Sequence, residues 1–194
     1  SNRFLVQSSI YDEFAEKLTQ RVNKFTMGNG TQDGITIGPL VNAQAAQAME
    51  ELVTGAVDAG AKLVTGGKRS DLGACFFEPT ILTEVTMKMT VAADEIFGPI
   101  APLIRFETEE EAIAIANDTV FGLASYMYTR DIGRIWRVSE ALEYGMVGIN
   151  EGLISNAAAP FGGVKQSGTG REGSKYGIED YLEIKYLCMG GLDK

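Results

Sequence analysis

The spacing of apolar side chains predicts an alternation of helices and strands along most of the chain. Apolar residues recur at helical spacing in four segments and form short runs typical of strands in five others. Helices are predicted over residues 11–25, 42–60, 108–116 and 131–142, and strands over residues 62–65, 76–82, 100–106, 123–128 and 146–149. Strands that alternate with helices indicate an α/β fold, with a mainly parallel sheet and flanking helices.

Polar residues and glycines mark where several of these helices begin and end. Ser9 to Asp12 resembles a capping box before the first helix, and Asn42 can cap the second. Thr108 and Glu111 supply both halves of another capping box, and Gly60 can end the second helix in a left-handed conformation. Pro79 lacks an amide donor, so it predicts a strand boundary or an edge strand.

The C-terminal part has a different pattern. Residues 168–177 are rich in turn formers, with a short helix predicted near Ser174. Residues 181–187 alternate between apolar and polar side chains, which is typical of an antiparallel strand. Such a strand either closes its own sheet or pairs with another subunit. We therefore predict one domain over residues 1–180 and a tail over residues 181–194.

Composition excludes several classes of function. The 194 residues are 45% hydrophobic, which is enough for a folded domain, and the net charge of -9 disfavours nucleic acid as a partner. No run of residues is long and apolar enough for a membrane span, so we expect a soluble protein. The chain has two cysteines and no histidine, so neither a zinc site nor a histidine-activated nucleophile is expected.

Two short motifs place aromatic rings beside glycines. In residues 95–99, the Glu95 carboxylate could accept hydrogen bonds from a ribose diol while the Phe97 ring lies against a planar heterocycle. An ordinary loop carboxylate is the alternative. In residues 160–168, Phe161 could form an apolar wall of a substrate tunnel, or it could simply pack in the core.

Other candidate motifs have simpler explanations. Residues 168–173 match the G-x-G-x-x-G pattern, but no strand precedes them, so we interpret them as a structural glycine turn. Residues 66–69 lack the spacing of a phosphate-binding loop and indicate a surface turn. Lys165 could contact an anion, although an exposed loop lysine is the simpler interpretation.

Several of these motifs together resemble the C-terminal motifs of the NAD(P)-dependent aldehyde dehydrogenase superfamily. They stand in the right order and span nearly the whole chain: residues 95–99, Asn117 with residues 121–124, residues 160–163 through 167–168, and residues 170–172. Within the superfamily, residues 150–155 and 173–183 most resemble the members that oxidise succinate semialdehyde to succinate. The resemblance implies an incomplete aldehyde dehydrogenase catalytic domain.

The resemblance also implies roles for particular residues. NAD or NADP would be the cofactor, with Glu95 on the nicotinamide ribose and Phe97 near the nicotinamide ring. Phe161 would line the aldehyde tunnel, and the Ser155 hydroxyl would donate a hydrogen bond to the distal carboxylate of the aldehyde substrate. A hydrogen bond to a charged acceptor is among the stronger ones and can select an acid-bearing aldehyde.

The chemistry itself departs from the family pattern. Family members attack the aldehyde with a cysteine thiolate and activate water with a glutamate, and both residues are expected upstream of this chain. No catalytic residue is therefore assigned within it, and we expect the chain alone to be inactive. Cys75 and Cys188 do not match the nucleophile motif.

The resemblance leaves several alternatives open. A homo-oligomer, dimer or tetramer, is expected to form through the C-terminal strand. Another aldehyde substrate, or a non-catalytic self-association module, remains an alternative function. The cytosol and the mitochondrial matrix are both consistent with two free thiols.

Overall fold

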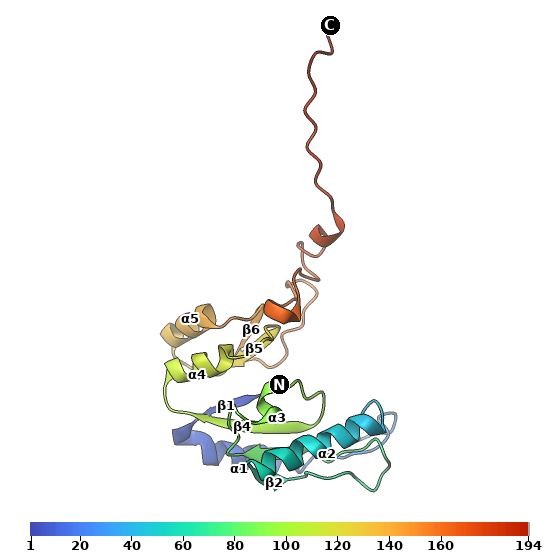
Figure 1. The fold of residues 1–194 in the computed structure, drawn as a ribbon, viewed down its shortest axis with the longest axis vertical. Helices are drawn as coiled ribbons and strands as arrows, with labels where there is room; N and C mark the ends of the chain where they lie inside the picture. Colours follow the sequence, from blue (N-terminus) through green and yellow to red (C-terminus); the bar gives the residue numbers. More distant parts are fainter. Residues whose placement is uncertain (194) are drawn as a thin grey trace. The chain divides into compact units, whose positions relative to one another are not determined.

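The computed structural model describes residues 1–193 and divides the chain into two units (Figure 1). The first unit comprises Ser1–Ala116, and the second begins at Asn117. Each unit contains a sheet of its own. This division differs from the predicted boundary between residues 180 and 181, which stays a prediction.

The first unit is built on a four-stranded sheet that is mainly parallel. Strand β4 lies between β1 and β3 and runs parallel to both, while β2 is antiparallel to β3 at one edge. The strands in spatial order are β1 (Phe4–Gln7), β4 (Ile100–Phe106), β3 (Thr80–Thr83) and β2 (Lys62–Thr65). The predicted α/β class with mainly parallel pairing is confirmed.

Helices cover both faces of this sheet. Neighbouring residues of a strand point to opposite faces, and on β4 they join two different buried clusters. Leu103 belongs to a cluster with Tyr11 of α1, whereas Ile104 belongs to one with Met49 of α2. The helices of this unit are α1 (Tyr11–Val22), α2 (Ala43–Asp58), the short α3 (Thr90–Ala93) and all but the last residue of α4 (Glu109–Asn117).

The predicted helix ends are confirmed where the polar group is local to the helix. The Asn42 side chain accepts a hydrogen bond from the Ala45 amide at 2.8 Å, and Gly60 adopts φ +105°. The Thr108 hydroxyl likewise accepts from the Glu111 amide at 3.2 Å. The predicted Ser9 cap is wrong, because residues Ser8–Ile10 form a 3-10 turn that leads straight into α1.

Some elements and boundaries differ from the prediction. Helix α1 ends at Val22 rather than Phe25, because the Phe25 amide bonds the Val22 carbonyl three residues back and tightens the last turn. Strand β1 and helix α3 were not predicted, since four residues carry too little periodicity. Pro79 lies just before β3, which confirms it as a strand boundary.

The second unit contains a two-stranded parallel sheet. Strand β5 (Ala124–Met127) pairs with β6 (Met146–Ile149), and helix α5 (Ile132–Ala141) connects them. The Asp131 side chain caps α5 by accepting a hydrogen bond from the Arg134 amide at 3.0 Å. That bond stabilises the carboxylate and lowers the pKa of Asp131. These three elements lie where the sequence predicts them.

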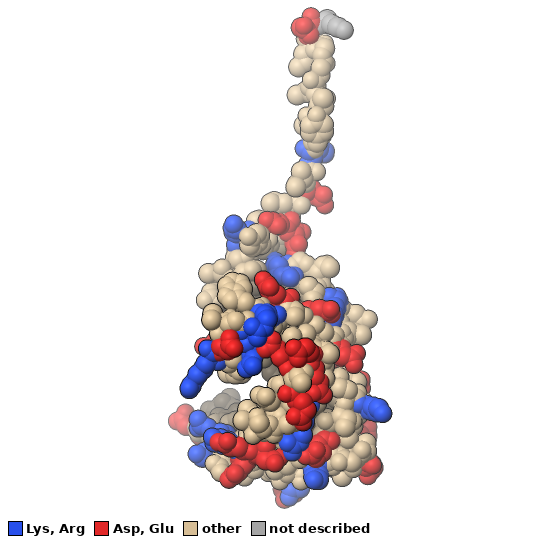
Figure 2. Space-filling model, turned by 90° about the vertical axis from the view of Figure 1, so that its left-hand side faces the viewer, with Lys and Arg blue, Asp and Glu red and all other residues tan. Residues whose placement is uncertain are grey.

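The C-terminal segment forms no strand within the described residues, so of the two alternatives for residues 181–187, closing a sheet of this chain is wrong and pairing with another subunit stays a prediction. Ser174 adopts φ +51° in a turn, and the only regular element beyond it in the described residues is a 3-10 turn at Glu179–Tyr181. The predicted short helix near Ser174 is therefore also wrong. No strand pairs with residues 181–193, whose side chains are exposed and mostly uncharged (Figure 2).

Candidate functional site

The loop that carries Glu95 and Phe97 turns both side chains outward around one buried anchor. Ile96 is only 4% exposed and belongs to the α2 core cluster, whereas Phe97 is 81% exposed. Glu95 is exposed as well. Because Ile96 is buried, the Glu95 carboxylate and the Phe97 ring on either side of it point outward.

The backbone that follows Ile96, over residues 97–99, is tightly constrained. Phe97 adopts φ +42°, a left-handed conformation that is unfavourable for a residue with a side chain. Next to it, a Cβ added to Gly98 would overlap the Sδ atom of Met49 on α2. The Pro99 carbonyl then accepts a hydrogen bond from the Thr80 amide at 2.8 Å. A side chain at position 98 would therefore require the Met49 side chain to shift.

The outward groups of this loop fit one half of a nicotinamide nucleotide. Among residues 1–193, no hydrogen bond or ion pair involves the Glu95 carboxylate, so both its oxygens can accept from a ribose diol. The exposed Phe97 ring has a free face for a planar heterocycle. The acceptor chemistry of Glu95 and the exposed ring of Phe97 thus fit the expectation from the sequence.

Ser155 and Phe161 meet in the second unit, at a hollow of about 170 Å³. Its wall is mainly apolar, and Ser155 and Tyr126 are the lining residues that carry a hydroxyl group. The hollow is lined by Leu123, Ala124, Tyr126, Met146, Gly152, Leu153, Ile154, Ser155 and Phe161. A mainly apolar wall with few polar groups is typical of a small-molecule site.

The backbone of Phe161 is fixed by a two-residue bridge. Its amide donates to the Glu172 carbonyl at 2.9 Å, and its carbonyl accepts from the Glu172 amide at 2.7 Å. Gly168, Gly170 and Gly173 all have positive φ, so the G-x-G-x-x-G segment that contains Glu172 is a structural turn, as predicted. That turn brings Glu172 back beside Phe161.

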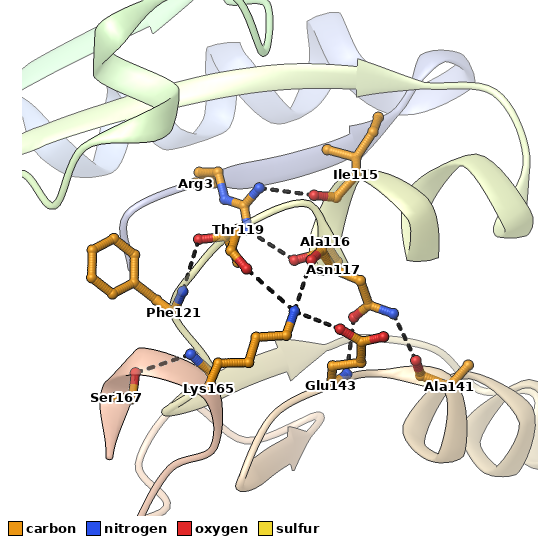
Figure 3. Close-up of polar contacts among 11 residues, drawn as sticks. Arg3, Ile115, Ala116, Asn117, Thr119, Phe121, Ala141, Glu143, Lys165 and Ser167 are labelled. Atoms are coloured by element: carbon orange, nitrogen blue, oxygen red, sulfur yellow. Dashed lines mark hydrogen bonds and ion pairs between the residues drawn. The ribbon is translucent and has the colours of Figure 1, made fainter.

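Lys165 is an exposed residue whose ammonium group is bound to other residues of the second unit. Its ammonium group donates to the carbonyls of Asn117 and Thr119 at 2.8 and 3.2 Å and pairs with Glu143 at 2.5 Å (Figure 3). The Ser167 hydroxyl accepts from the Gly122 amide at 2.9 Å. Lys165 is therefore exposed, as the simpler interpretation expected, and its ammonium group holds the loop after Phe161 rather than standing free for an anion.

The other chemical groups of the described chain add no further centre. Cys75 is half-buried and Cys188 is exposed, and both are free thiols. Within residues 1–193, no three His, Cys, Asp or Glu side chains gather at a possible metal site. No helix in the described part is long and apolar enough to span a bilayer. The structure thus groups the predicted site residues in pairs, Glu95 with Phe97 in the first unit and Ser155 with Phe161 in the second.

Comparison with known proteins identifies a family. Residues 1–187 match the aldehyde dehydrogenase family. The chain is 58% identical over 194 residues to a 3-sulfolactaldehyde dehydrogenase of Pseudomonas putida, covering 100% of this chain and 40% of that protein. It is 60% identical over 192 residues to a glutarate-semialdehyde dehydrogenase of Pseudomonas aeruginosa, covering 99% of this chain and 40% of that protein.

Solved structures agree with this. The crystal structure of succinate-semialdehyde dehydrogenase from Burkholderia pseudomallei is similar with a TM-score of 0.95 and 61% identity, covering 97% of this chain and 39% of that one. A betaine aldehyde dehydrogenase from Staphylococcus aureus, in complex with NAD+, is similar with a TM-score of 0.89 and 42% identity, covering 94% of this chain and 37% of that one. The chain therefore spans only about 40% of the length of the relatives it matches.

Proposed function

Because the chain belongs to the aldehyde dehydrogenase family, we propose that it is the C-terminal portion of an enzyme that oxidises succinate semialdehyde to succinate with NAD or NADP. The observation that carries this proposal is the hollow where Ser155 and Phe161 share a mainly apolar wall. Such a site can take the short carbon chain of the substrate and a polar group at its far end.

On the cofactor side, Glu95 accepts hydrogen bonds from the nicotinamide ribose and Phe97 packs near the nicotinamide ring. The outward positions of both side chains and the unoccupied acceptors of Glu95 support these roles. The nicotinamide supplies the hydride acceptor for the oxidation. The S. aureus relative was crystallised with NAD+, which supports a nicotinamide cofactor here.

On the substrate side, the Ser155 hydroxyl donates a hydrogen bond to the distal carboxylate while Phe161 lines the path of the aldehyde. The names of the similar enzymes support an acid-bearing substrate, since 3-sulfolactaldehyde carries a sulfonate and the glutarate and succinate semialdehydes carry carboxylates. These other acid-bearing aldehydes are the rival substrates. We further propose that the attacking cysteine and the base glutamate belong to a part of the enzyme outside these residues.

The decisive experiment is the Ser155→Ala substitution in the full-length enzyme. Removing a hydrogen bond to a charged group should raise KM for succinate semialdehyde by roughly ten- to a hundredfold, because such bonds contribute about 1.5–3 kcal/mol. KM for an uncharged aldehyde of similar length should change little. Steady-state kinetics with both aldehydes, and with glutarate semialdehyde and 3-sulfolactaldehyde, measures this.

Ser9→Ala is the matched control, because Ser9 is an exposed serine in the first unit and should leave both constants unchanged. Equal rises of KM for the charged and uncharged aldehydes in Ser155→Ala would refute the role of Ser155. If kcat/KM of the wild-type enzyme were higher for glutarate semialdehyde or 3-sulfolactaldehyde, that aldehyde would take the place of succinate semialdehyde as the proposed substrate.

A further inference from the structure

The side chain of Asn2 brackets Glu95 with two hydrogen bonds. Its Oδ1 atom accepts from the Ile96 amide at 2.8 Å, and its Nδ2 atom donates to the Asp94 carbonyl at 2.7 Å. The two bonded peptide groups are those immediately before and after Glu95. Asn2 thus holds the cofactor loop from a position 92 residues away in the sequence.

A primary amide suits this bracket for a chemical reason. The Asp94 carbonyl can only accept a hydrogen bond, and the Ile96 amide can only donate one. The asparagine side chain supplies one donor and one acceptor with the orientation that a neighbouring peptide group would have. With both flanking peptide groups fixed, the backbone dihedrals of Glu95 and the direction of its Cα–Cβ bond are fixed too.

The bracket is rigid because both of its sides are anchored. On the Asn2 side, the Arg3 guanidinium donates to the carbonyls of Ile115 and Ala116 at 2.8 and 2.9 Å. Phe4 then enters β1 opposite Leu103. On the loop side, the Ile96 side chain is buried in the α2 core cluster. Movement of the Glu95 backbone would have to break the Asn2 bonds first.

We propose that Asn2 is a positioning residue of the cofactor site, which holds the Glu95 carboxylate in the direction required to bind the nicotinamide ribose. Asn2 acts through Glu95 and touches no cofactor itself. This inference rests on the proposed function, because it takes Glu95 as the ribose ligand.

A double-substitution cycle in the full-length enzyme tests the inference through cofactor binding alone. Kd for NADH and for NADPH is measured from the fluorescence of the bound nucleotide in four proteins: wild type, Asn2→Ala, Glu95→Ala and the double variant. Each single substitution should raise Kd about tenfold, which corresponds to the loss of one hydrogen bond to a charged group. The double variant should bind no more weakly than Glu95→Ala, because Asn2 has no effect once the carboxylate is gone.

Two further variants keep the result interpretable. Asn42→Ala removes a helix cap on α2 and should lower stability while leaving Kd at the wild-type value. Asn2→Ser keeps a polar side chain that is too short to reach both peptide groups, so it should raise Kd in the same direction if Asn2→Ala does not fold.

The possible failures are distinct. Wild-type Kd in both Asn2 variants, or a double variant whose Kd is the product of the two single effects, would overturn the positioning role and leave the proposed function standing. An unchanged Kd in Glu95→Ala would overturn the cofactor role of Glu95 and the inference together.

Discussion

Glycines let backbone segments of the second unit touch where no side chain would fit. A Cβ added to Gly145 would overlap the Gly162 carbonyl oxygen, and one added to Gly162 would press on the Gly170 carbonyl. Backbone atoms cannot swing aside as the end of a long side chain can. The glycines beside Phe161 therefore serve close packing, which in turn fixes the position of the ring.

We predict that Gly145→Ala destabilises the protein by about 1–3 kcal/mol, the usual range for overpacking. The midpoint of urea unfolding, followed by circular dichroism, measures the change. Gly30→Ala is the control, because Gly30 has no atom within 4 Å of its added Cβ and no positive φ. Equal unfolding midpoints of the two variants would contradict the packing argument.

At the scale of the element, helix α2 packs against the loop of residues 95–99. Met49 contacts the loop at Gly98, and Met49, Val53 and Ala56 are buried on one side of the helix. The helix starts at the Asn42 cap, so the position of its first turns depends on a group outside the core. The Asn42 cap thus contributes to the stability of the start of α2.

Asn42→Ala should lower the free energy of unfolding by about 1 kcal/mol, because the Ala45 amide loses its acceptor. Asn42→Asp should retain most of the stability, since aspartate also accepts from that amide. Urea titration of the two variants gives the comparison. A loss for Asn42→Asp as large as that for Asn42→Ala would show that the cap bond contributes nothing.

At the scale of the whole molecule, the C-terminal segment exposes apolar side chains that could pack against another subunit. Ile184 is 99% exposed, and Tyr181, Tyr186 and Leu187 are also exposed. Alternating apolar residues with unpaired backbone groups can add a strand to the edge of another sheet. We propose that residues 181–194 pair with a second copy of the protein.

Deletion of residues 181–194 should reduce the mass of the particle in solution. Multi-angle light scattering of the full-length enzyme, with and without these residues, measures it. Ile184→Asp is a milder version, because a buried unpaired charge at a subunit interface is costly. An unchanged mass in both variants would rule out the pairing role.

The sequence predicted correctly those helix ends that depend on interactions between residues close together in the chain. The caps at Asn42 and Thr108 act within a few residues of themselves, and these elements agree with the structure. The predicted Ser9 cap is wrong because the 3-10 turn at Ser8–Ile10 continues directly into α1. The residue types alone do not distinguish such a turn from a capped helix start. The pairs Glu95–Phe97 and Ser155–Phe161 came from motif resemblance, and their roles stay predictions.

Asn2 illustrates what the sequence did not reveal about the candidate site. Nothing in its neighbourhood marks it, because its partners Asp94 and Ile96 are distant in the chain. A signal existed only in the loop itself, where an outward carboxylate beside a strained Phe97 must be held by something. The sequence of the loop does not indicate which residue holds it.

The sequence by itself determined the α/β class, the positions of most helices and strands, and the family. These properties depend on periodic burial and on turn and cap residues, whose interactions are local. The tertiary structure alone decided that Asn2 reaches Glu95's neighbours, that Lys165 is bound by Asn117, Thr119 and Glu143, and that Ser155 and Phe161 share a hollow. Such contacts join distant segments, and they form only because the packing of the core brings those segments together.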